Sequence, residues 1–215
     1  MEPAETHPDR LIDFWEWLVE NRRQVVLAIF VVFAVVVGVY INRQSEQLAE
    51  EEAGEDVLAV IDNRFSTEEV DSKSQASERF AKIMVNHPDT AAASNAKFLQ
   101  ASALFDEGEF TEAEAVFSAY ASENPESPLR AAAALGQAAC KASLDDPDAE
   151  SKYEAIRNLY TGTPEAVQAT LALGRLKMAA KNTTKAKELF TVVSTNRISR
   201  FWASEANKLL GQLPE

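Results

Sequence analysis

The sequence predicts an all-α protein with a single N-terminal transmembrane helix, a stack of about four helix hairpins and a C-terminal capping helix. Three observations support this fold class. Alanine is abundant while glycine occurs only 7 times in 215 residues, which favours helix over sheet. Residues 25–41 form an apolar run without a charge. The rest of the chain repeats a pattern of small and aromatic residues at a nearly constant interval.

The apolar run predicts a membrane anchor. At about 1.5 Å per residue, a helix over 25–41 crosses a hydrocarbon core of about 30 Å once the flanking interfacial residues are included. Arg22 and Arg23 precede the run and only Arg43 follows it closely, so the positive-inside rule places the N-terminus in the cytoplasm. A buried core helix and a cleaved secretion signal are the alternatives. We therefore expect a cytoplasmic tail at 1–23, a transmembrane helix at 24–42 and an extracytoplasmic domain at 43–215.

The segment LIDFWEWLVENRR, directly before the run, predicts an amphipathic helix. Its acidic side chains fall on one narrow face of a helical wheel, and its apolar side chains cover the opposite face. Helices that lie on anionic lipid usually have a basic polar face, so the segment is either a plain interfacial helix or a docking site for another protein. The candidate docking residues are Asp13, Trp15, Glu16, Trp17 and Glu20.

A small residue followed four positions later by an aromatic residue recurs at intervals of 37, 36 and 37 residues. The pairs are Ala76 and Phe80, Ala113 and Phe117, Ala149 and Tyr153, and Ala186 and Phe190. A second marker, a small residue 12 or 13 positions earlier, occurs at Ala101, Gly136 and Gly174. Two markers in phase predict helix hairpins in which the small residue lets two backbones approach and the aromatic ring fills the space beyond.

Turn residues separate the predicted helices. Pro88 and Pro125 each stop one helix and prime the next. Gly108 can take the left-handed conformation that ends the first helix of a hairpin. The segment 200–213 reads as a last helix that shields the end of the stack, with Phe201 and Trp202 as core residues.

Charge and rare residue types limit the possible functions. A net charge of −13 repels phosphate backbones, so we expect no nucleic-acid binding. Cys140 is the single cysteine and reads as a small buried thiol. The acidic run 145–150 lacks the glycine and glutamate of a calcium loop, which favours the opening of a helix instead. No phosphate loop, H-E-x-x-H motif or nucleophile elbow occurs, so we expect neither enzyme activity nor a cofactor.

The repeat pattern resembles the tetratricopeptide repeat, whose unit of about 34 residues has small, aromatic and proline markers in this order. The resemblance implies an α-solenoid whose first helices line a concave groove for protein partners. The family's groove positions correspond to Asn95, Phe98, Ser102, Phe105, Arg130, Gln137, Cys140, Gln168, Leu171, Arg175 and Met178. For Phe98, packing in the core is an equally good explanation.

The layout as a whole resembles the family of the bacterial ancillary subunit of the Sec translocon, whose repeat domain is related to that of the periplasmic cell-division coordinator. The resemblance implies a single-pass protein of the bacterial inner membrane with a periplasmic repeat domain. It implies translocon subunits, a membrane-anchored periplasmic chaperone and exported proteins as partners, with the lipid bilayer around the span. The alternatives are a scaffold for cell-envelope or cell-division complexes and a structural protein that associates with itself.

Overall fold

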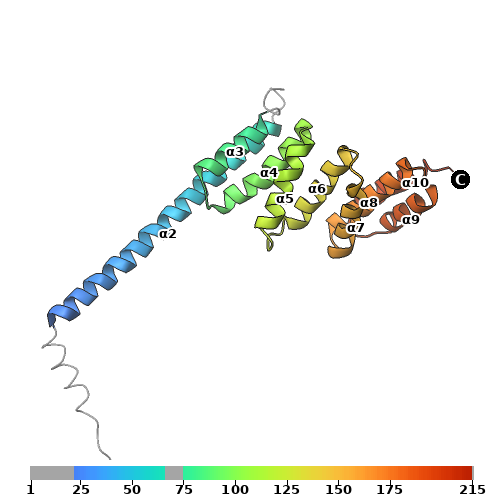
Figure 1. Cartoon of the computed structure of the whole chain (residues 1–215). Helices are drawn as coiled ribbons and strands as arrows, with labels where there is room; N and C mark the ends of the chain where they lie inside the picture. Colours follow the sequence, from blue (N-terminus) through green and yellow to red (C-terminus); the bar gives the residue numbers. More distant parts are fainter. Residues whose placement is uncertain (1–21, 66–74, 215) are drawn as a thin grey trace, which may run out of the picture. The chain divides into compact units, whose positions relative to one another are not determined.

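The structure of the protein is a computed structural model, whose course Figure 1 shows. It describes residues 22–65 and 75–214, and at 22–32, 34, 64 and 65 it describes the backbone alone. Over these ranges the chain is helical and contains no strand, so the all-α prediction is confirmed there. The chain divides into two compact units, Met1–Glu51 and Glu52–Glu215.

Nine helices follow one another within the described ranges, and from α3 onward they are joined by short turns (Figure 1). Their bounds are α2 Arg22–Phe65, α3 Ala76–Asn86, α4 Ala91–Glu107, α5 Phe110–Glu123, α6 Arg130–Ser143, α7 Asp148–Leu159, α8 Pro164–Ala179, α9 Thr183–Ser194 and α10 Arg200–Leu210.

The helices form hairpins in the predicted order. Each helix from α3 to α9 packs against the next one in the chain. The C-terminal part of α2 joins this series because Ala53, Val57 and Val60 lie in one core cluster with residues of α3 and α4. The second unit therefore contains the pairs α2 with α3, α4 with α5, α6 with α7 and α8 with α9, followed by α10.

The predicted repeat markers form the core. All four alanines and all four aromatic residues of the marker pairs are at most 5% exposed. Gly136 and Gly174 of the second marker lie against aromatic rings. A Cβ atom at Gly136 would lie 2.6 Å from the ring of Phe117, and one at Gly174 would meet the ring of Phe190. Only glycine fits at these positions without movement of a buried ring.

Local sequence sets where the helices begin and end. Gly108 ends α4 with a φ of 87°, in the left-handed conformation predicted from the sequence. Thr90 and Thr163 begin α4 and α8, where each side-chain oxygen accepts a hydrogen bond from a backbone N–H three residues later. The first helix of a hairpin is therefore fixed at its N-terminus by a threonine in two of the repeats.

One core prediction is wrong. Phe201 was expected to be a core residue, but its side chain is 68% exposed on α10. Because α10 ends the series of helices, nothing in the described chain covers its outer face, and Phe201 lies on that face. Its ring makes an edge contact with Trp202, at 4.6 Å between ring centroids, and Trp202 itself is half-buried.

The predicted membrane segment lies largely beyond what the structure describes. Its backbone at 24–42 belongs to α2, but the side chains at 24–32 and 34 are outside the described residues. Among the residues that are described, no helix combines the length and the apolar character needed to cross a bilayer. Asp13, Trp15, Glu16, Trp17 and Glu20 lie outside the described residues, as do the side chains of Arg22 and Arg23.

The contact between Gly136 and Phe117 gives a test of the packing. We expect Gly136→Ala to lower the free energy of unfolding by about 1–2 kcal/mol, because the added methyl group must displace a buried ring. Gly54→Ala is the matched control, since a Cβ atom there meets nothing within 4 Å. That substitution should leave stability unchanged or raise it by up to about 1 kcal/mol. Denaturant unfolding followed by circular dichroism measures both, and equal effects would contradict the packing described.

A candidate partner groove

Three first helices of the hairpins share one wall of a groove. α4 contacts α6, α6 contacts α8, and α8 also contacts α10. Their side chains enclose an open space of about 540 Å³, a volume typical of ligand sites. The side chains from these helices are Phe98, Ser102, Phe105 and Asp106 on α4, Ala132, Leu135, Gly136 and Ala139 on α6, Gln168, Leu171, Ala172 and Arg175 on α8, and Trp202 on α10.

The groove is hollow because its middle wall is built from small residues. On α6, Ala132, Gly136 and Ala139 face the groove at intervals of four and three residues, which is one face of a helix. Bulkier side chains on α4 and α8 stand on either side. Phe117 and Tyr153, from the second helices α5 and α7, contribute to the lining. The small residues that let the helices pack closely therefore also leave the space of the groove next to α6.

The lining is mostly apolar, with a few polar groups. Ser102 donates a hydrogen bond to the carbonyl of Phe98 in its own helix, at 3.1 Å. Arg175 Nη2 lies 3.0 Å from Glu205 Oε1 and so joins α8 to α10. Among the described residues, the Gln168 side chain has no hydrogen-bond partner. An apolar ligand segment can thus be buried here while one amide and one guanidinium group set its orientation.

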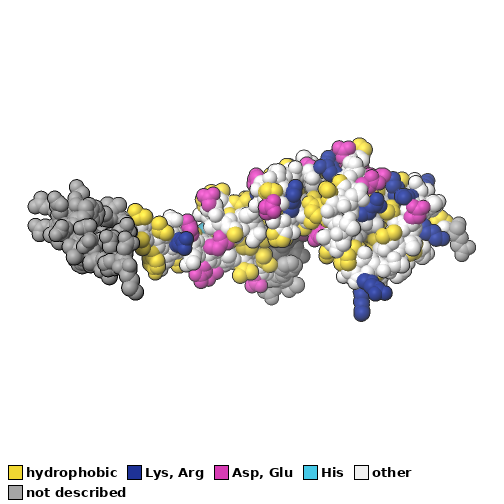
Figure 2. All heavy atoms as spheres, turned by 90° about the horizontal axis from the view of Figure 1, so that it is seen from below, with side chains coloured by type: hydrophobic (Ala, Val, Ile, Leu, Met, Phe, Trp, Pro, Cys, Tyr) yellow, Lys and Arg dark blue, Asp and Glu magenta, His cyan; other side chains and the backbone are white. Residues whose placement is uncertain are grey.

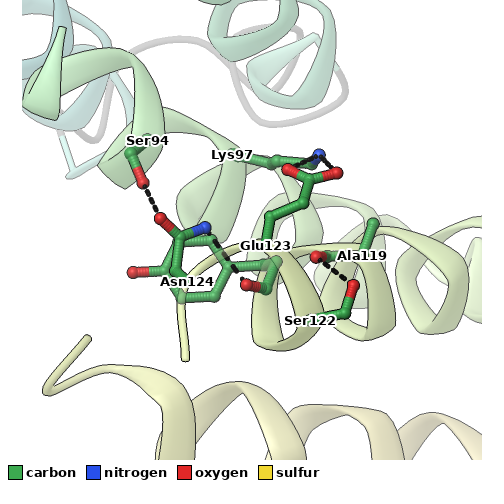
Figure 3. A network of polar contacts seen from close by, with 7 residues as sticks. Ser94, Lys97, Ala119, Ser122, Glu123 and Asn124 are labelled. Carbon is green, nitrogen blue, oxygen red and sulfur yellow. Dashed lines mark hydrogen bonds and ion pairs between the residues drawn. The ribbon is translucent and has the colours of Figure 1, made fainter. Parts of the chain in front are cut away.

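Polar contacts hold the start of α4 against the end of α5 (Figure 3). Lys97 Nζ lies 2.6 and 2.8 Å from the carboxylate oxygens of Glu123. Ser94 donates to the side chain of Asn124, which in turn donates to the carbonyl of Tyr120. These bonds fix the angle of the hairpin. The next turns of α4 then present Phe98, Ser102 and Phe105 to the groove.

Phe98 packs against the hairpin core and also lines the groove. Its ring lies 5.7 Å from that of Phe117 and 5.6 Å from that of Tyr120, measured between centroids. Such distances are typical of stabilising aromatic pairs. Another part of the ring lines the groove. A partner in the groove would therefore rest on a side chain that the hairpin core holds in place.

The structure brings together some of the predicted groove residues and not others. Those that line the groove are Phe98, Ser102, Phe105, Gln168, Leu171 and Arg175. Gln137 lies elsewhere on α6, where it donates to Glu114 of α5 and accepts a 3.4 Å hydrogen bond from Lys152 of α7. Cys140 is fully buried in the core. Asn95 is exposed, Met178 packs toward α9 and α10, and Arg130 donates to the carbonyl of Pro125.

On α6 the groove is lined by another helical face than the one predicted from the sequence. The predicted residues Gln137 and Cys140 do not line it, whereas Ala132, Gly136 and Ala139 do. These three small residues recur at intervals of four and three, and that spacing is a signal of a shared helical face that the sequence contains. Trp202 was missed as a groove residue because α10 lies outside the repeat pattern.

The acidic run at 145–150 forms the turn before α7 and the first turn of that helix. Lys141 Nζ lies 2.6 Å from Asp146 Oδ2, and Asp146 Oδ1 accepts from the backbone N–H of Asp148. The hydrogen bond from Lys141 lowers the pKa of Asp146 below its usual value. In the part of the chain that the structure describes, no group of three or more His, Cys, Asp or Glu residues could hold a metal ion.

The fold is a stack of helix hairpins in which the helices α4, α6 and α8 line a groove. The sequence matches the tetratricopeptide repeat-like domain over residues 15–150, which is more than half of the chain, and the protein belongs to this family. Domains of this type generally mediate protein–protein interactions and typically act as scaffolds. α8, α9 and α10 continue the same architecture beyond the matched residues. Comparison with curated proteins yields no match.

Cys140 provides a chemical test of the core next to the groove. Burial raises the pKa of its thiol to about 11, and the charge of Glu114 adds to the rise. At pH 8 the native thiol should therefore contain about a hundredfold less thiolate than an ordinary one, and it should react with a disulfide reagent at least that much more slowly. Unfolding in denaturant should restore a normal rate. Fast labelling of the native protein would show that α6 opens readily or packs differently.

Proposed function

We propose that the protein is a membrane-anchored scaffold that assists the Sec translocon of the bacterial inner membrane and helps to pass exported proteins to periplasmic chaperones. In this proposal, residues 24–42 span the membrane, the tail 1–23 is cytoplasmic and the hairpins face the periplasm. Exported proteins or the chaperone bind in the groove, and the acidic segment at 11–23 contacts the translocon. The function requires neither catalysis nor a cofactor.

The groove is the observation that carries this proposal. A mostly apolar channel that crosses α4, α6 and α8 suits an extended or helical segment of another protein, rather than a compact polar molecule. Phe98, Phe105 and Trp202 supply aromatic surface, and Arg175 supplies a guanidinium group. Aromatic residues and arginine are enriched among residues that dominate binding energy. A groove of this kind fits chains that are still unfolded, because such chains expose apolar segments.

The translocon assignment rests on the layout of the sequence. A single charge-free run follows Arg22 and Arg23, and the large repeat domain comes after it. The acidic face that the sequence predicts for Asp13, Glu16 and Glu20 is unfavourable against anionic lipid alone, which favours a protein contact at that segment. The family membership supports a protein-binding role, and the translocon is the particular partner that we propose.

Photo-crosslinking tests where partners bind. A crosslinker at Phe105 should capture exported proteins or a periplasmic chaperone, and one at Trp17 should capture translocon subunits. Ala139→Arg should lower capture at Phe105 by about tenfold or more, because it fills the groove with a charged side chain. Ser118→Arg is the matched control, since Ser118 is exposed on α5 and is not among the groove residues. Thermal melts establish that both variants fold.

Two results would decide against the translocon role, and a third would decide against the groove as the binding site. Capture of cell-division or cell-wall synthesis proteins at both positions would favour the envelope scaffold instead. Capture of other copies of the same chain alone would favour self-assembly. Equal capture at Phe105 in the Ala139→Arg and Ser118→Arg variants would show that partners do not use the groove.

Membrane anchoring has a separate test. If 24–42 spans the bilayer uncleaved, alkaline washing should leave essentially all of the full-length chain in the membrane fraction. A reporter that is active only outside the cytoplasm, fused after Glu215, should be active. Replacing Arg22 and Arg23 by glutamate should reduce that activity, because these arginines set the orientation. Release by alkali, or a shortened N-terminus, would refute the anchor.

A further inference from the structure

The charges of the chain are separated along its length. Residues 46–62 contain seven acidic and no basic residues. Residues 175–208 contain eight basic and two acidic residues, although the whole chain has a net charge of −13. On the face shown in Figure 2, most of the Lys and Arg side chains lie over the C-terminal helices. The first and last parts of the helix series therefore have opposite charge.

The acidic charge forms a surface on the outer side of α2. Ala53, Val57 and Val60 are buried against α3 and α4. On the opposite side of this helix are four exposed residues, which we call the acidic end face: Glu52, Glu55, Leu58 and Asp62. Leu58 is 66% exposed, and none of the three carboxylates forms an ion pair with the residues that the structure describes.

The basic charge forms a corresponding surface at α10. Ala206 and Leu209 of α10 are buried against α9 and α8. Four exposed residues at the other side and in the preceding turn make up what we call the basic end face: Arg197, Arg200, Phe201 and Lys208. Phe201 is 68% exposed. Each end of the helix series thus presents exposed apolar side chains among charges of a single sign, with Leu58 at one end and Phe201 and Ile198 at the other.

We propose that two copies of this chain associate head to tail, with the acidic end face of one copy against the basic end face of the other. Opposite charges draw the two faces together, and the contact buries Leu58 and Phe201, which no neighbour covers within the described chain. A hairpin stack grows by packing each helix on the one before it, and this contact continues that packing from copy to copy. Because the two faces differ, the association is heterologous and gives a ring or an open row of copies.

A second copy accounts for more than the other possible occupants do. Anionic lipid would explain the basic end face alone, and the strongly negative remainder of the chain opposes approach to such a surface. A basic protein would explain the acidic end face alone. Only another copy of this chain uses both faces. The inference does not depend on the translocon or on the membrane anchor, and it can fail while either of those holds.

Charge reversal provides the test, with the full chain in a non-ionic detergent and its mass followed by sedimentation velocity. At low salt the mass should rise with concentration, and about 0.5 M salt should weaken association by about tenfold, because screening is then nearly complete at contact distances. The first variant, R197E/R200E/K208E, makes both faces acidic. The second variant, E52K/E55K/D62K, makes both faces basic. Each variant alone should be monomeric, and an equimolar mixture of the two should associate again.

A control variant and two contrary results complete the test. E109K/E112K/E126K changes the net charge as the second variant does, at exposed positions of the turns and of α5 away from both end faces, and should associate normally. A monomeric wild-type chain at all concentrations, or a mixture that fails to associate, would overturn the proposal. If the wild type stays monomeric but binds vesicles that contain phosphatidylglycerol, and the first variant does not bind them, lipid is the occupant of the basic end face.

Discussion

The architecture depends on the close approach of helices at small residues beside aromatic rings. A single helix of this chain cannot bury its apolar face alone, because that face needs a partner helix on each side. Gly136 beside Phe117 and Gly174 beside Phe190 show how near the backbones come. Once these contacts set the spacing, the first helices α4, α6 and α8 stand side by side. The groove is a consequence of that spacing, since alanine and glycine on α6 leave the space that Phe98 and Leu171 border.

The repeat architecture could be predicted well from the sequence because its markers are set by packing. A small residue and a ring four positions later have few alternatives once two helices cross, so Ala113 and Phe117 identified both the helix and its buried face. Gly108 identified a turn for the same reason, because its positive φ is costly for other residues. Such features are local. Because each hairpin packs only against its neighbours in the sequence, the order of the hairpins along the chain also gives their order in the stack.

The groove residues were less predictable because a groove is defined by what does not fill it. The polar residue Gln137 was predicted to line the groove. The space of the groove is instead left by Ala132 and Ala139, which in the sequence resemble ordinary core residues. Phe201 was misplaced for a different reason. Hydrophobicity indicates burial only where a neighbour exists, and the last helix of a stack has neighbours on one side. The groove lining and the exposure of Phe201 both depend on contacts between helices that the sequence of a single repeat does not encode.

Neighbour-to-neighbour packing also determines how the binding surface can change in evolution. Each hairpin contributes one first helix, and therefore one strip of wall, to the groove. Loss or duplication of a unit of 36 or 37 residues would shorten or lengthen the channel while the remaining strips keep their alignment. Substitution of the small residues on α6 would alter its depth without any change in length. The length of the groove can thus change only by whole repeats, whereas its depth can change by single substitutions.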